Sequence, residues 1–214
     1  MEHAPPQFRN GLVAPVPGAK YIGGWDLGNT LNPAFVLLMV TQDQVVACFE
    51  MVAPSPQQFR PFCQAVKKKL QAYLPGNWPD VDHQGDPAGA ARNNEGYSAF
   101  DIASEFGFRI KPARTNNIEA RIDCVGMILR KFVDQTGEES TWRRAFIISE
   151  AGCPMLTNAL KGAYCYRSRK NNSQMYAEPM KNSYSHVSDA LQYGMLSANG
   201  VFAAKRKVTN VWRT

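Results

Sequence analysis

The first part of the chain alternates short apolar runs with turn-forming residues. The apolar runs are Tyr21 to Trp25, Ala34 to Val40 and Val45 to Met51, with polar and turn residues between them. Apolar runs of this length, bounded by turn signals, are typical of strands. Their close succession predicts hairpin connections, so we expect the antiparallel opening of a mixed sheet.

A helical period follows these strands. Between Pro56 and Leu74, apolar residues recur at three- and four-residue spacing, and Pro75-Gly76 ends the pattern. This is the stripe of an amphipathic helix. A fourth strand is then expected within Trp78 to Gly85, stopping at Asp86, because Pro87 suits the first turn of a helix.

The rest of the chain alternates between the two periods. We predict helices at Ser98 to Phe106, Ile118 to Phe132 and Cys153 to Lys161, strands at Phe108 to Lys111 and Ala145 to Ser149, and a hairpin of Tyr164 to Arg167 with Gln174 to Met180. A last helix, Ser185 to Ala198, begins with a serine cap and closes at Asn199-Gly200. Residues 1–20, rich in proline and glycine, are expected to form no regular element and to be a linker or trimmed boundary before a single domain of residues 21–214.

This succession predicts an α/β fold, a mixed sheet with helices on both faces. The pattern does not reveal the strand order, and the ribonuclease H-like arrangement is one solution. The chain has 214 residues, 44% of them apolar and 20% charged, which suits one domain with its own core. Its formal charge of +6 favours a polyanionic partner, although many proteins that never bind nucleic acid carry such an excess.

Cysteine usage and hydropathy exclude several classes. The five cysteines include no Cys-x-x-Cys pair, which argues against a zinc site and a disulfide framework and favours a reducing compartment. No apolar run reaches the roughly 18 residues of a spanning helix, and the start of the chain does not resemble a signal peptide. We therefore expect a soluble intracellular protein that does not bind a membrane.

Two aspartates close predicted strands. Asp26 ends an apolar run and precedes Leu27-Gly28, where the small glycine would let a metal and a phosphate approach. Asp86 is similar, although Asp-Pro is also an ordinary helix cap. Carboxylates on neighbouring strand ends can share hard cations, so the pair predicts a divalent-metal site.

A third aspartate is expected on the last helix. Asp189 follows His186 by three residues, so both side chains lie on one helical face. His186 would bind metal, orient water or hold a phosphate, or it is only a cap. Asp82 is on the same predicted strand as Asp86 but about 13 Å away, too far to share a metal. Glu150 is a weaker reserve candidate.

Four stretches together resemble the nuclease domain of the large terminase subunit of tailed double-stranded DNA bacteriophages. They are Gly24-Trp-Asp-Leu-Gly28, Gly85-Asp-Pro-Ala-Gly89, residues 112–122 and residues 181–193, in the order of the family. The resemblance covers nearly the whole chain after residue 20. It implies a ribonuclease H-like fold and a metal-dependent endonuclease that cuts concatemeric viral DNA during genome packaging.

The resemblance also implies roles for particular residues. Asp26, Asp86 and Asp189 match the metal-binding acids, which would hold two Mg or Mn ions, and His186 matches a histidine of some members. Implied partners are double-stranded DNA, an ATPase motor domain, the small terminase subunit and the portal, in the cytoplasm of an infected bacterium. The chain has no Gly-x-x-x-x-Gly-Lys-Ser/Thr motif, so we expect the nuclease part without the motor.

Basic residues near the expected site are candidates for contacts to DNA phosphates. They are Arg92, Lys111, Arg114, Arg121, Lys161, Arg167, Arg169, Lys170 and Lys181. Three other functions stay open. Asp26 to Thr30 also resembles the first phosphate loop of actin-like and sugar-kinase-like phosphotransferases, a Holliday-junction resolvase would use similar chemistry, and a DNA-binding module would use none.

Overall fold

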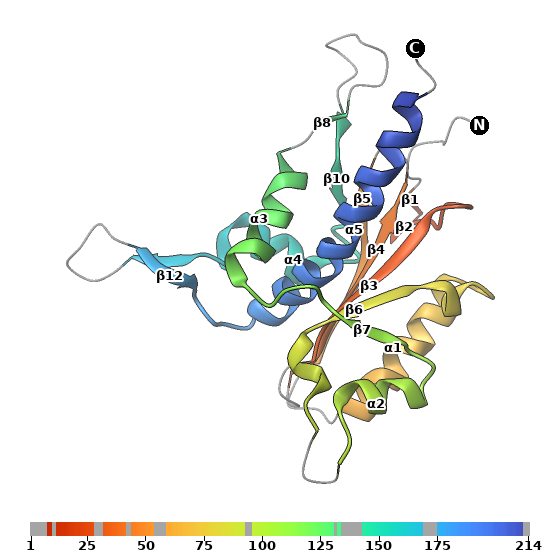
Figure 1. The fold of residues 1–214 in the computed structure, drawn as a ribbon, viewed down its shortest axis with the longest axis vertical. Coiled ribbons are helices and arrows are strands. Elements are labelled where there is room, and N and C mark those ends of the chain that lie inside the picture. Colours follow the sequence, from red (N-terminus) through yellow and green to blue (C-terminus); the bar gives the residue numbers. More distant parts are fainter. Residues whose placement is uncertain are drawn as a thin grey trace.

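The central sheet contains six strands in the order β10-β5-β4-β3-β6-β7 (Figure 1). The computed structural model describes residues 8–9, 12–27, 32–41, 44–53, 59–92, 96–130, 132–133, 143–168 and 175–211. The sheet strands are β3 (Lys20–Asp26), β4 (Ala34–Val40), β5 (Val45–Val52), β6 (Asp82–Gly85), β7 (Ile110–Pro112) and β10 (Phe146–Ile148). The strand β4 runs antiparallel to β3 and β5, whereas β10 with β5, β3 with β6 and β6 with β7 pair parallel.

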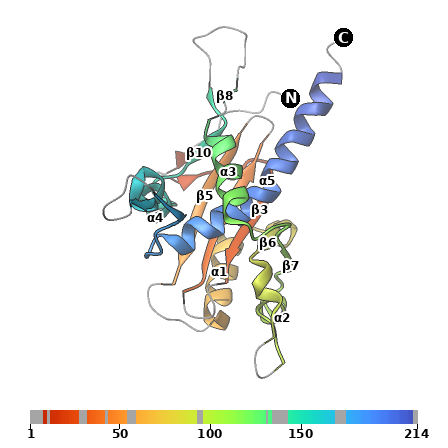
Figure 2. The same ribbon diagram turned by 60° about the vertical axis from the view of Figure 1, so that its left-hand side comes forward.

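Helices cover both faces of this sheet. They are α1 (Phe59–Tyr73), α2 (Ala99–Glu105), α3 (Ile118–Leu129), α4 (Pro154–Asn158) and α5 (Ser185–Val211), with a 3₁₀ helix η2 (Trp78–Asp80), a 3₁₀ helix η3 (Pro87–Ala90) and a π-helical turn (Ala159–Ala163). Smaller two-stranded pairs are β1 (Phe8–Arg9) with β2 (Leu12–Val13), β8 (Phe132–Val133) with β9 (Arg143–Arg144), and β11 (Tyr166–Ser168) with β12 (Met175–Pro179). Figure 2 shows α3, α4 and α5 on one side of the sheet and α1 on the other.

The side chains of β4 divide the core into two layers. Val36 and Leu38 face the layer of α3, α4 and α5, whereas Phe35 and Leu37 face α1 and α2. All four are fully buried, so β4 is the central apolar strand. The predicted mixed sheet with helices on both faces is confirmed.

Trp25 is at the centre of the second layer. Its ring packs against Phe35 and Phe108, and its indole N–H donates to Nδ1 of His83 at 3.0 Å. Burial lowers the pKa of His83 to about 4. A neutral imidazole is therefore the acceptor that satisfies the buried indole.

Several predicted boundaries differ from the structure. The helix α3 ends at Leu129, and Phe132 belongs to β8, which shortens the predicted helix. Within residues 1–20, where no regular element was expected, β1 pairs with β2, and Val13 is buried in the core. The proposed domain boundary itself stays a prediction.

The last helix also differs. It continues through Asn199-Gly200 to Val211, because Asn199 uses its side-chain amide to donate to the Cys124 carbonyl at 3.0 Å. Docking on α3 therefore replaces the predicted helix stop. Ser185 is the first helical residue, and its hydroxyl accepts the N–H of Asn182 at 2.8 Å, which ties the helix to the preceding loop. Among the described residues, no helix combines the length and apolarity needed to cross a membrane.

Candidate functional site

Two aspartates leave the sheet at adjacent strand ends. Asp26 is the last residue of β3, and Asp86 directly follows β6. The register pairs Trp25 with Gly85, and the Asp86 N–H donates to the Trp25 carbonyl at 3.3 Å. Asp86 also caps η3, where its Oδ1 accepts the N–H of Ala88 at 2.9 Å. The two carboxylates thus start from neighbouring points of one sheet edge, as predicted.

Glycines bring α5 directly onto β3. A Cβ on Gly24 would lie 2.1 Å from the Ala190 carbonyl oxygen and 2.8 Å from the Gly194 nitrogen. Only a residue without a side chain allows this approach. The first turns of α5 are therefore held against the end of β3, where Asp26 is.

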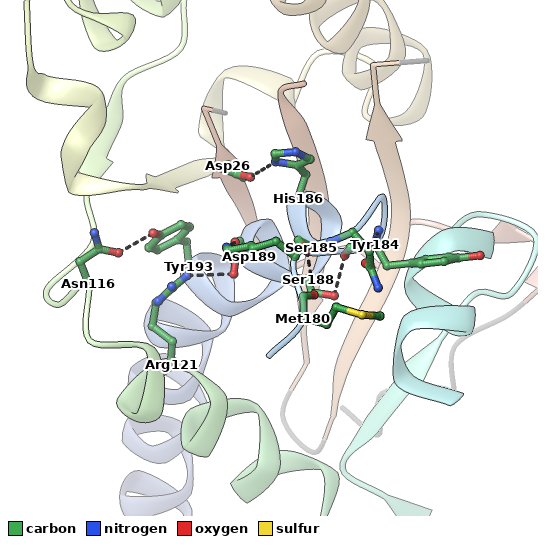
Figure 3. A network of polar contacts seen from close by, with 12 residues as sticks. Asp26, Asn116, Arg121, Met180, Tyr184, Ser185, His186, Ser188, Asp189 and Tyr193 are labelled. Atoms are coloured by element: carbon green, nitrogen blue, oxygen red, sulfur yellow. Dashed lines mark hydrogen bonds and ion pairs between the residues drawn. The ribbon is translucent and has the colours of Figure 1, made fainter. Parts of the chain in front are cut away.

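His186 contacts Asp26 directly. Its Nδ1 lies 2.7 Å from Oδ2 of Asp26, as Figure 3 shows. This hydrogen bond raises the pKa of His186, while partial burial lowers it and the charges of Asp26 and Asp189 raise it. The imidazole is thus held beside a carboxylate that favours its protonated form.

Asp189 is bound by two basic side chains. Nη1 of Arg121 lies 3.2 Å from Oδ1, and Nζ of Lys181 lies 3.0 Å from Oδ2. The Arg121 and Asp189 side chains are 6% and 9% exposed, whereas that of Lys181 is 65% exposed. Each oxygen of Asp189 therefore has its own cation, one buried and one at the surface.

Tyr193 contacts Asn116 and Arg121 beside the acids. Its hydroxyl donates to Oδ1 of Asn116 at 2.7 Å, and the Arg121 guanidinium lies 4.6 Å above its ring (Figure 3). Burial raises the pKa of the Tyr193 hydroxyl, and Arg121 lowers it. Charges that raise this pKa further belong to three carboxylates, those of Asp86, Asp189 and Asp26. Tyr193 therefore links Asn116 to Arg121, which in turn contacts Asp189.

The side chains of this site offer carboxylate oxygens to a divalent metal ion. Among the residues that the structure describes, no cluster of three or more Asp, Glu, His or Cys side chains is close enough to hold an ion. Basic side chains instead contact two of these acids. Lys181 and Arg121 contact Asp189, and His186 contacts Asp26. Carboxylate oxygens are the right donors for Mg or Mn, and the ammonium on Asp189 marks a place for positive charge. The chemistry of the residues fits a hard cation that would replace Lys181.

Competing acids lie outside this group. Asp82 begins β6 and pairs with Lys111 at 2.9 Å and Lys20 at 3.6 Å, which accounts for its charge without a metal. Glu150 pairs with Lys161 at 3.2 Å on the surface.

The basic residues predicted to contact DNA have different surroundings. Arg92 and Arg114 are exposed. Arg121 is 5% exposed and occupied by Asp189, so its prediction as a phosphate contact is corrected. Only the backbone of Arg167 is described, in β11, and Arg169 and Lys170 lie outside the described residues. Apart from Arg121, these contacts stay predictions.

Two members of the polar network were not expected from the sequence. Tyr193 and Asn116 were not singled out as site residues, whereas Arg121 was expected at the site as a contact to DNA phosphates. The four-residue spacing of Asp189 and Tyr193 was an available signal, because it puts both on one helical face. The position of α3 beside α5 had no signal in the sequence.

Comparison with known proteins bears on the fold. No protein-family model and no curated protein matches the chain. The structure is similar to the large terminase of a thermophilic bacteriophage, with a TM-score of 0.63 and 16% identity over 92% of this chain and 42% of that one. It is also similar to the nuclease domain of the phage P22 large terminase, with a TM-score of 0.59 and 14% identity over 95% of this chain and 91% of that domain.

A third similar structure is the nuclease domain of the large terminase from bacteriophage SPP1 with bound Mn. Its TM-score is 0.54, with 15% identity over 82% of this chain and 84% of that domain. The chain thus spans less than half of the thermophilic phage protein and most of each nuclease domain. The ribonuclease H-like fold and the resemblance to terminase nuclease domains are confirmed at the level of the fold.

Proposed function

We propose that this chain is a metal-dependent endonuclease that cuts double-stranded viral DNA during genome packaging. The observation that carries the proposal is the placement of Asp26 and Asp86 on adjacent strand ends, with Asp189 on α5 one turn after His186, which contacts Asp26. The fold shared with terminase nuclease domains supports it, as does the Mn bound in the SPP1 domain.

The three aspartates would hold two divalent ions, Mg or Mn. Each offers hard oxygen atoms, although Oδ1 of Asp86 already accepts a backbone N–H. When bound, such ions lower the pKa of an attacking water and stabilise charge on the phosphorus and the leaving 3′ oxygen. The products would carry 5′-phosphate and 3′-hydroxyl ends.

His186 would position groups in this site. Its Nδ1 is committed to Asp26, which fixes one oxygen of that carboxylate. The other ring nitrogen, Nε2, can hold a water or a phosphate oxygen. This is an orienting role, and a structural role in fixing Asp26 alone is its alternative.

The resemblance to terminase nuclease domains supports a proposal for substrate and partners. Three exposed basic side chains would contact DNA phosphates, those of Arg92, Arg114 and Lys161. The net charge of +6 favours binding of a polyanion such as DNA. We propose concatemeric DNA as substrate, with an ATPase motor domain, the small terminase subunit and the portal as partners. The site of action would be the cytoplasm of an infected bacterium.

A plasmid cleavage assay with Mg or Mn alone tests the proposal. The wild-type protein should nick or linearise the plasmid, and Asp26→Asn, Asp86→Asn and Asp189→Asn should remain folded and lose at least about a hundredfold in rate. Asparagine keeps the side-chain oxygen that caps η3 at position 86. Asp82→Asn, on the strand that leads to Asp86, is the matched control and should cut normally. Full activity of all three site variants would refute the assignment.

The same samples separate the other functions. Preference for a four-way junction over linear duplex would indicate a resolvase, and ATP binding by calorimetry would indicate a phosphotransferase. Metal-independent DNA binding without cleavage would indicate a binding module. The proposed endonuclease instead cuts linear duplex and needs no nucleotide.

A further inference from the structure

We propose that the two cations on Asp189 have different roles in metal binding: Arg121 stays on Oδ1 as a positioning residue, and the Lys181 ammonium leaves Oδ2 when a divalent cation binds. The inference rests on the proposed function, because it concerns the same carboxylate. At that carboxylate, a divalent cation would replace the Lys181 ammonium and leave the Arg121 guanidinium in place. Arg121 and Lys181 are distinguished by the surroundings of their side chains.

Arg121 is enclosed. Its guanidinium lies 4.6 Å above the Tyr193 ring, and Tyr193 is fixed in turn by its 2.7 Å hydrogen bond to Asn116. The Arg121 side chain is 6% exposed, so it cannot exchange Asp189 for water without rearranging α3 and α5. A planar guanidinium stacked on an aromatic ring and bound to a carboxylate holds that carboxylate in one orientation. Oδ1 of Asp189 therefore stays bound to Arg121, and Oδ2, which contacts Lys181, is the oxygen that would bind a metal.

Lys181 has the opposite setting. It lies between β12 and α5, and its side chain is 65% exposed although its ammonium is 3.0 Å from Oδ2. Only the lysine end of this pair is exposed, and an ammonium on a flexible four-carbon stem regains hydration easily. Release of Lys181 into water therefore has a low cost.

A metal and the ammonium compete for the same oxygen. Mg binds carboxylate oxygens at about 2.0 to 2.1 Å, which would bring a dication close to the ammonium now on Oδ2. The ammonium is also within electrostatic reach of Asp26, the second proposed ligand. The two positive charges repel, so the metal-bound state favours Lys181 turned outward. Lys181 thus keeps the acids compensated until the metal arrives.

Lysine acylation read by peptide mass spectrometry tests the exchange in the full chain. Acetic anhydride should modify Lys181 slowly without metal and about 1.5- to fivefold faster with Mn, the factor that corresponds to about 0.2 to 1 kcal/mol for a pair whose ammonium is exposed. Lys161, which pairs with Glu150 at 3.2 Å away from the site, is the internal control and should not change. In Asp189→Asn, Lys181 should react fast with or without Mn.

Manganese affinity, measured by electron paramagnetic resonance, separates positioning from charge. Lys181→Met and Arg121→Met each remove one positive charge, so a pure charge effect would tighten Mn binding in both. We expect Lys181→Met to bind Mn about two- to fivefold more tightly. Arg121→Met should bind it more weakly, with partial recovery in Arg121→Lys.

The outcomes also separate the two proposals. Mn binding by the wild-type protein with unchanged acylation of Lys181 would overturn the exchange and leave the nuclease proposal standing. Tighter Mn binding by Arg121→Met would overturn the positioning role. If the wild-type protein binds no Mn, both proposals fail together. The acylation test uses the wild-type protein and does not depend on any variant folding.

Discussion

Gly24 of β3 and Gly194 of α5 meet backbone to backbone. A Cβ on Gly194 would lie 3.2 Å from the Cα of Gly24, and one on Gly24 would lie 2.8 Å from the nitrogen of Gly194. The contact fixes the distance between helix and sheet just beyond the turn that carries His186 and Asp189. The site therefore depends on two residues that carry no functional group.

Replacing Gly24 with alanine should destabilise the protein. The new methyl group meets backbone atoms of α5, which cannot move aside as a side chain would. We expect a loss of about 1 to 3 kcal/mol in urea denaturation, together with weaker Mn binding. Gly200→Ala, on the same helix with open space around it, is the control and should gain up to about 1 kcal/mol. Equal stability of wild type and Gly24→Ala would contradict the close contact.

Arg121→Met should reduce stability much more than Lys181→Met. Loss of Arg121 leaves the buried Asp189 carboxylate without its enclosed partner, which typically costs about 3 to 5 kcal/mol. Loss of the exposed Lys181 should cost at most about 1 kcal/mol. The double variant Arg121→Met, Asp189→Leu removes the charge as well and should recover most of the loss. Chemical denaturation at pH 7 measures all three.

Acid should destabilise the protein through His83. Burial lowers the pKa of His83 from 6.5, its ordinary value in an unfolded chain, to about 4, so the unfolded chain binds more protons between these values. Stability therefore rises with pH through this window and is lost as the pH falls from 6.5 towards 4. The loss between pH 7 and pH 5 should be about 2 kcal/mol. His83→Gln keeps an acceptor for the Trp25 indole and has no group that titrates in this range. Chemical denaturation at pH 7 and pH 5 should therefore show a smaller loss of stability in this variant than in the wild-type protein.

The basic segment between β11 and β12, for which the sequence predicts a turn, is expected to contact DNA. Replacing Arg167, Arg169 and Lys170 with glutamine should weaken duplex binding and reduce the salt slope by up to about 3, since fewer counterions are released. Fluorescence anisotropy over a salt series measures it. The control removes the same charge from Lys67-Lys68-Lys69 of α1, on the other side of the sheet. An unchanged slope in the first variant would exclude this turn from the interface.

Much of the fold could be predicted because local pattern and tertiary position agree. The strand Ala34–Val40 is a continuous apolar run that is buried on both faces, and α1 ends at the Pro75-Gly76 signal. Strand order was beyond prediction, because it depends on pairing between distant segments such as β10 and β5. The end of α5 was wrong for a similar reason, since contact with α3 through Asn199 overrides a local stop signal.

Part of the candidate site could also be predicted from local sequence patterns, and part could not. Asp26 and Asp86 could each be placed at the end of a strand, and the parallel pairing of β3 with β6 in the structure brings both to one edge. The burial of Arg121 had no local signal in the sequence, because only the packing of α3 on α5 buries it. Pairing across elements, which no local pattern encodes, decides which charges reach solvent.

Trp25 gives this molecule a built-in optical probe. Its carbonyl receives the Asp86 N–H, its chain neighbour is Asp26, and its indole is locked by His83 in a fully buried ring cluster. With the other three tryptophans changed to phenylalanine, the blue-shifted emission would come from the Trp25 indole alone, next to the ends of both strands. Cation loading could then be followed in real time by stopped flow, without any attached dye.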